Sequence, residues 1–190
     1  YPRLVQALDA LERQLSTPRA IDRFLAQVSL ALSYHDPAEI NDVDLIMLTF
    51  MRVRFPGVYV ELPRWRHTLT RTTSPTAWAR GQSTSPDLSR LLRLAGDDQD
   101  SQDARTVLEL LFPALTLGVS SGSSERRVGH PDYFSRYFVH AVPEEDVAES
   151  EIQEALHDAS TAGPRQTLLR KLLTVSYPGK ADLALRKLRR

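Results

Sequence analysis

The sequence contains no cysteine among its 190 residues, and lysine occurs only at Lys171, Lys180 and Lys187. The absence of cysteine excludes disulfide bonds, thiolate metal ligands and thiol nucleophiles. No apolar run approaches the roughly 18 to 20 residues that cross a bilayer, and the first residues lack the apolar core of a secretion signal. We therefore expect a cytoplasmic protein.

Familiar catalytic motifs are also missing. The sequence has no G-x-x-x-x-G-K-[ST] phosphate loop, no G-x-G-x-x-G dinucleotide turn, no H-E-x-x-H zinc helix and no G-x-S-x-G nucleophile elbow. The histidines lack the spacing of paired metal ligands and are scattered along the chain, at His35, His67, His130, His140 and His157. For the chain on its own we expect no catalytic residue, no metal site, no cofactor and no activity.

Helical periodicity runs through nearly the whole chain, and no sustained alternation of apolar and polar residues indicates a sheet. We predict an all-α protein, an irregular helical bundle of about seven to nine helices. Thr17 has the side chain of an N-cap and Pro18 suits the first helical position, so a helix should begin there. Its expected buried face is Ile21, Phe24, Leu25, Val28 and Leu32.

The next segments continue this pattern. Asn41 or Asp42 should cap a mostly apolar, and therefore buried, helix that Pro56-Gly57 interrupts before a shorter helix. A Ser, Thr, Pro and Gly-rich loop, 70–86, leads to a short helix that Ser85 should cap. Residues 97–103 look like a polar connector in front of a further apolar helix, 104–115.

The chain divides into three parts in this interpretation. Residues 1–115 form a helical domain, 116–129 form a flexible linker, and 130–190 form a C-terminal helical segment. In "HPDYFSRYF" the aromatic residues are expected to be core, whereas Arg136 lies on another side and is a candidate interface residue.

Charge is uneven near the C-terminus. Residues 143–158 are acidic, whereas from Arg165 to Arg190 only Asp182 opposes a run of basic side chains. A basic end can bind nucleic acid or an acidic partner, but a run of this kind is more often the solvated face of a helix. Nucleic acid is therefore the less favoured partner.

Three stretches occur in a familiar order: "TPRAIDRF" at 17–24, "NDVDLIMLTFMRVRFPGVYVEL" at 41–62 and "HPDYFSRYFVHAVPEEDV" at 130–147. Together they resemble the C-terminal helical region of the KAP family of P-loop NTPases, over roughly residues 1–147. The resemblance implies that the phosphate loop, the Mg²⁺-binding acid and any membrane-inserted segments lie upstream in the same polypeptide. It also implies ATP and Mg²⁺ as ligands of that full-length ATPase, with membrane contact only through the upstream segments.

Under this resemblance the chain is a lid and sensor that couples ATP binding and hydrolysis to a defence or signalling output. Arg19 would reach the γ-phosphate of the nucleotide, and Arg23, one turn further on, is the alternative. The alternative interpretation is that Arg19 has no ligand and is only an exposed residue in the first turn of a helix. Two other functions stay open, a helical protein-interaction module and a nucleic-acid-binding domain independent of nucleotide, and so does a homo-oligomer.

Overall fold

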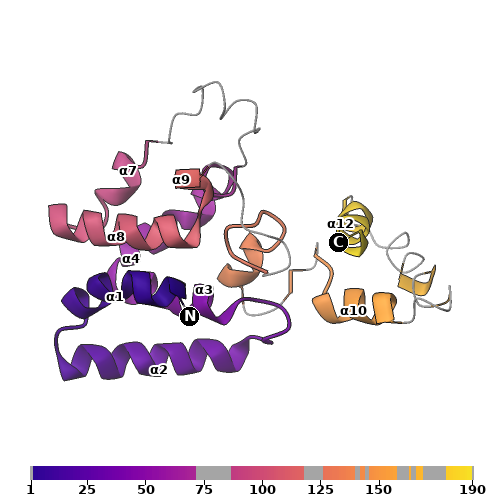
Figure 1. The fold of residues 1–190 in the computed structure, drawn as a ribbon, viewed down its shortest axis with the longest axis horizontal. Coiled ribbons are helices and arrows are strands. Elements are labelled where there is room, and N and C mark those ends of the chain that lie inside the picture. The colour runs from indigo at the N-terminus through magenta and orange to yellow at the C-terminus, as the bar shows by residue number, and fades with distance from the viewer. Residues whose placement is uncertain are drawn as a thin grey trace.

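The computed structural model describes residues 2–71, 87–117, 126–139, 142–143, 146–157, 163, 166–168 and 179–189. Within these ranges the regular elements are ten α-helices and two 3₁₀-helices, and no residue lies in a strand. The all-α prediction is therefore confirmed, with slightly more helices than expected. Figure 1 shows the larger helices grouped together and α10 with α12 as a separate pair at the C-terminal end.

Twelve regular elements lie in the described residues. In order they are α1 (Pro2–Gln14), α2 (Pro18–Tyr34), α3 (Asp42–Arg54), α4 (Pro56–Glu61), η1 (Leu62–Trp65), α5 (Arg66–Leu69), α7 (Ser89–Leu92), α8 (Asp98–Leu111), α9 (Ala114–Leu117), η3 (Phe134–Phe138), α10 (Glu149–His157) and α12 (Lys180–Leu188).

Helix α3 is the centre of the main core. Eight of its residues are buried, and it packs against α1, α2, α4 and α8. The Asn41 side chain caps it by accepting from the Asp44 N–H at 3.2 Å, and the chain breaks at Phe55 before α4, both as predicted. Phe50 meets the rings of Phe24 and Phe55 edge-on, with centroids 6.1 and 5.8 Å apart. The apolar sequence of α3 explains this position, because a helix that is apolar on most sides must be covered on most sides.

Helix α2 begins as the sequence predicts but buries less than expected. Thr17 Oγ1 accepts from the Ala20 N–H at 3.2 Å, and Pro18 occupies the first helical position. Phe24 is buried, whereas Ile21 and Leu25 are 41% and 53% exposed, so the prediction that they share the buried face is wrong. The reason is that α2 packs mainly on α3, so the side of α2 that carries Phe24 is covered and the side that carries Ile21 and Leu25 is not.

The predicted connector at 97–103 is also wrong. These residues cap α8 and form its first turns, because Asp97 accepts from the Asp100 N–H at 2.8 Å and two further acids lie in the first turn. Acidic side chains favour a helix N-terminus, where they satisfy free N–H groups and the positive end of the helix dipole. The preceding Gly96 has φ of 137°, a left-handed conformation that glycine adopts without strain. Ser85 and residues 72–86 lie outside the described residues.

The predicted linker, 116–129, is described only at its two ends, since 118–125 lie outside the described residues. At its C-terminal end Arg127, Val128 and Gly129 are buried. The Asp44 carboxylate, itself fully buried, accepts from the Val128 N–H at 2.9 Å and pairs with Arg127 at 3.4 Å. These three residues of the linker therefore belong to the packed interior beside α3.

The aromatic segment that follows packs on the main core, as expected for its side chains. Tyr133, Phe134 and Tyr137 are buried there, but the backbone forms turns and the short helix η3 instead of the expected α-helix. The second, smaller core lies between α10 and α12 and contains Val147, Ile152, Ala155, Leu168 and Ala184. The change from one core to the other thus falls after η3, later than the predicted start of the C-terminal segment at residue 130.

Candidate functional site

Three arginines surround a small cavity at the N-terminal end of α2. The cavity has a volume of about 220 Å³ and is lined by Thr17, Arg19, Ala20, Arg23, Val53 and Arg54. Arg19 and Arg23 are four residues apart on α2, so they lie on one face of that helix, and Arg54 joins them from the end of α3. All three side chains are exposed. We call this group the arginine cluster.

Arg54 is held by a hydrogen-bond chain that runs through three helices. Its Nη2 and Nε donate to Gln14 Oε1 of α1 at 2.6 and 3.0 Å. The Gln14 amide nitrogen donates in turn to Asp100 Oδ1 at 2.7 Å and to Asp103 Oδ2 at 3.0 Å on α8. The neutral Gln14 therefore orients Arg54 without neutralising its charge.

Asp103 anchors this chain from inside the protein. Its carboxylate is fully buried and accepts from Arg13 Nη2 at 2.6 Å and from Gln99 Nε2 at 3.1 Å, besides Gln14. Burial alone would raise the pKa of this carboxyl, but the hydrogen bonds from Arg13, Gln14 and Gln99 outweigh it and hold the pKa below its ordinary value. The charged Asp103 thereby fixes α1 against α8 behind the arginine cluster.

The arginine cluster suits an anion with several oxygens. Within the described ranges no carboxylate forms an ion pair with Arg19, Arg23 or Arg54. Guanidinium groups stay charged and present a planar fork of donors that matches phosphate oxygens. The N-terminus of the long helix α2 adds a positive dipole end on the same side. The structure thus brings the two predicted arginines, Arg19 and Arg23, to one place.

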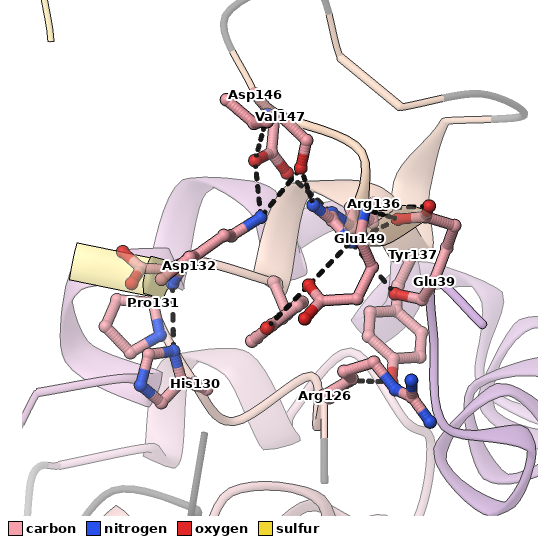
Figure 2. A network of polar contacts seen from close by, with 12 residues as sticks. Glu39, Arg126, His130, Pro131, Asp132, Arg136, Tyr137, Asp146, Val147 and Glu149 are labelled. Atoms are coloured by element: carbon pink, nitrogen blue, oxygen red, sulfur yellow. Dashed lines mark hydrogen bonds and ion pairs between the residues drawn. The ribbon is translucent and has the colours of Figure 1, made fainter. Parts of the chain in front are cut away.

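Arg136, the third predicted site residue, lies elsewhere and is only 2% exposed. Figure 2 shows its guanidinium between Glu39, Asp146 and Val147. Nη1 donates to Glu39 Oε2 at 2.6 Å, Nε to Asp146 Oδ2 at 2.5 Å and Nη2 to the Val147 carbonyl at 2.6 Å. The expectation of an interface residue is corrected accordingly, because these contacts occupy the guanidinium inside the chain.

The network around Arg136 joins the two cores. Lys187 of α12 is buried and donates to Asp146 Oδ1 at 2.8 Å, although burial and the nearby Arg136 lower its pKa. Burial would raise the pKa of Asp146, but its bond to Arg136 and the charge of Lys187 outweigh this and lower it. On the other side, both Glu39 oxygens accept from the Glu149 N–H at 2.8 Å, so Glu39 caps α10. The basic C-terminal helix is therefore not simply a solvated face.

Sequence reasoning missed Arg54, Gln14, Glu39 and Lys187. Their partners lie far away along the chain: Arg54 and Gln14 are separated by 40 positions, and Lys187 and Asp146 by 41. Periodicity reports only neighbours on one element, so it does not reveal such pairs. The burial of Lys187 could have been suspected, because Lys187 lies three residues after Ala184 and so on the same face of its helix, and Ala184 is buried.

Comparison with protein-family models, with curated proteins and with solved structures found no match to this chain. In the described part of the chain, no helix combines the length and apolar character that crossing a bilayer requires. The same residues contain no group of three or more histidine or carboxylate side chains placed to hold a metal ion, while His140 lies outside them.

Proposed function

We propose that this chain is the lid and sensor region of a KAP-like P-loop NTPase, and that Arg19 and Arg23 contact the phosphates of ATP bound to the P-loop core of the same polypeptide. Mg²⁺ belongs to that core in this proposal, and the full-length protein is a cytoplasmic ATPase. Its hydrolysis cycle is transmitted through these helices to a defence or signalling output. The isolated chain has no turnover of its own.

The observation that supports the proposal is the arginine cluster. Two arginines one turn apart on α2, joined by Arg54 and left without a carboxylate among the described residues, form a surface of unbalanced positive charge. A transferring phosphoryl group spreads negative charge over its oxygens, and a positioned arginine stabilises that charge. Because Asp103 and Gln14 fix the helices behind Arg54, the cluster is preorganised for such a contact.

Helix α2 also has an exposed side that carries apolar residues. Ile21 and Leu25 lie four residues apart, and both are largely exposed on α2. Because two positions along an α-helix correspond to a rotation of about 200°, Ile21 and Leu25 lie on nearly the opposite side of α2 from Arg19 and Arg23. In the proposal they contact another part of the full-length protein.

The test is ATP turnover of the full-length protein at saturating ATP. Arg19→Ala should lower turnover about tenfold or more, and Arg19→Lys should restore little of it, because a point charge does not reproduce the guanidinium fork. Arg90→Ala is the matched control, since Arg90 is an exposed arginine on α7, away from the cavity. Turnover that survives Arg19→Ala and Arg23→Ala, or a full-length protein without a phosphate loop, would overturn the proposal.

A protein-interaction module independent of nucleotide is the second candidate. It is favoured by the exposed apolar side chains of the first two helices, Val5, Leu8, Ile21 and Leu25. Ile21→Ser combined with Leu25→Ser should then abolish partner binding while Arg19→Ala leaves it unchanged. Under the lid proposal Arg19→Ala should instead depress turnover. Nucleic acid is less favoured as a partner, because the buried Lys187 and the Asp132-paired Arg186 remove two cations from the basic C-terminal helix.

A further inference from the structure

A second cavity lies at the opposite end of α2. Its volume is about 510 Å³, and its walls come from α2, α3, α4, η3 and Val139. Pockets of roughly 300 to 1,000 Å³ are typical of small-molecule sites. The arginine cluster does not contribute to it, since the two cavities share no lining residue.

Much of the lining of this cavity is apolar. Leu45 and Leu48 of α3 form a buried wall of the cavity, and Phe138 of η3 also lines it. Leu30 of α2 and Val139 lie at the exposed margin of the cavity. An apolar hollow of this size gains free energy when an apolar group of matching shape displaces its water. The body of a ligand here would therefore be hydrocarbon.

One corner of the cavity is rich in hydrogen-bond donors. Arg52 of α3 is half-buried, and its one hydrogen-bond partner among the described residues is Gln27, whose Oε1 accepts from Arg52 Nη2 at 3.0 Å. A guanidinium carries five N–H donors, so most of those of Arg52 remain available. Because its carbonyl oxygen is engaged by Arg52, the Gln27 side chain presents its NH₂ group as the remaining polar end.

Tyr59 of α4 is the third polar side chain of this corner. Its ring packs on the Phe138 ring with centroids 5.7 Å apart. Burial raises the pKa of its hydroxyl, and the positive charge of Arg52 acts against this shift, so the hydroxyl is protonated and lies within the electrostatic reach of Arg52. Arg52, Gln27 and Tyr59 thus offer donors, and no carboxylate of the described residues forms an ion pair with Arg52.

We propose that this cavity binds a monoanionic amphipathic acid, with its carboxylate on Arg52, Gln27 and Tyr59 and its apolar body against Leu45, Leu48 and Phe138. A half-buried guanidinium without a counterion favours an anion, since its charge is only partly solvated. The apolar walls disfavour a polyphosphate, which would carry several charges into a cavity where Arg52 is the one arginine or lysine. The site is independent of the lid proposal, because it shares no residue with the arginine cluster.

The test uses 2-naphthoate as the anionic probe and 2-naphthamide as its neutral counterpart, with the whole chain. Calorimetric titration should give saturable one-to-one binding of the naphthoate and at least about tenfold weaker binding of the amide. Nuclear Overhauser contacts from the naphthalene protons should reach the methyl groups of Leu30, Leu45 and Leu48. These contacts locate the probe without any substitution.

Variants then isolate the role of the charge. Arg52→Gln should weaken naphthoate binding about tenfold or more, and Arg52→Lys should recover part of it. Arg54→Gln is the matched control, because it removes the same charge from the same turn of α3 but lines the other cavity. The proposal is overturned if naphthoate does not bind, if the amide binds equally well, or if Arg54→Gln weakens binding as much as Arg52→Gln. Failure here leaves the ATP turnover test unaffected.

Discussion

Arg52 and Arg54 lie two residues apart in the last turn of α3, yet each is held by a glutamine of a different helix. Arg52 Nη2 donates to Gln27 of α2 at 3.0 Å, and Arg54 Nη2 donates to Gln14 of α1 at 2.6 Å. Two positions along an α-helix correspond to a rotation of about 200°, so the side chains leave on nearly opposite sides. Each lines a different cavity, which makes each arginine the natural control for the other.

The arginine cluster should bind a polyphosphate even in the isolated chain. With tripolyphosphate as probe, Arg54→Gln should weaken binding several-fold, because a charge-assisted contact is lost and the other two arginines remain. The combined change Arg19→Gln and Arg23→Gln should abolish it. Calorimetric titration at low ionic strength is the measurement, since salt screens exposed charges. If Arg52→Gln weakened tripolyphosphate binding as much as Arg54→Gln does, the polyphosphate would not bind at the arginine cluster.

Thr17 and Arg19 should separate stability from function. Thr17→Ala removes the cap that accepts from the Ala20 N–H and should lower the free energy of unfolding by about 1 kcal/mol. Arg19→Ala should change it by less than about 0.5 kcal/mol, because the exposed side chain has no ion pair in the described structure. Urea denaturation of both variants measures these changes in the free energy of unfolding. A large loss for Arg19→Ala would mean that Arg19 serves the helix rather than a ligand.

The sequence predicts those features of the fold that depend on residues within a single helix. The caps Thr17 and Asn41 and the break at Phe55 all lie where side-chain chemistry dictates them. The prediction that residues 97–103 form a connector is wrong because acidic residues are common both in loops and at the start of a helix. The acidic residues themselves indicated the helix start, and the prediction assigned them to the wrong structure.

Tertiary contacts decided what the sequence pattern left undetermined. The apolar pattern on α2 includes Ile21 and Leu25, but the way α2 packs on α3 leaves them exposed. In the arginine cluster, Arg19 and Arg23 could be predicted to lie close together because they are four residues apart on one helix. Arg54 could not be predicted, because it belongs to another helix and is held in place by its hydrogen bond to Gln14. Arg136 was misplaced for the same reason, since Glu39 and Asp146 reach it from other parts of the chain.

Glu39 should couple α10 to the main core. Its carboxylate accepts from the Glu149 N–H and from Arg136, so Glu39→Ala removes the cap of α10 and one partner of a buried cation. Amide exchange in α10 should accelerate at least about tenfold, with a smaller change in α3. Glu154→Ala is the control, as Glu154 is an exposed acid on α10. Equal acceleration in α3 would show that Glu39 supports the whole fold and not this junction.

Asp103 and Asp146 should make the fold sensitive to acid. Both carboxyls have pKa values lowered in the folded protein, despite burial, by hydrogen bonds and nearby cations. An unfolded aspartate protonates near pH 3.9, so between that value and the lower folded pKa the unfolded chain binds more protons. The stabilisation is therefore fully present above about pH 5 and is lost as the pH falls through the folded pKa.

Asp103→Asn isolates one of these contributions. At pH 7 the variant should unfold more easily than the wild type, because the buried charged partner of Arg13 and Gln14 is lost. Since asparagine does not titrate, the difference should shrink as the pH falls, and the thermal unfolding midpoints of the two proteins should converge toward pH 3. Asp98→Asn, an exposed change in the first turn of the same helix, should leave the acid dependence close to that of the wild type. Parallel curves for Asp103→Asn and wild type would mean that the Asp103 carboxylate does not carry the acid sensitivity.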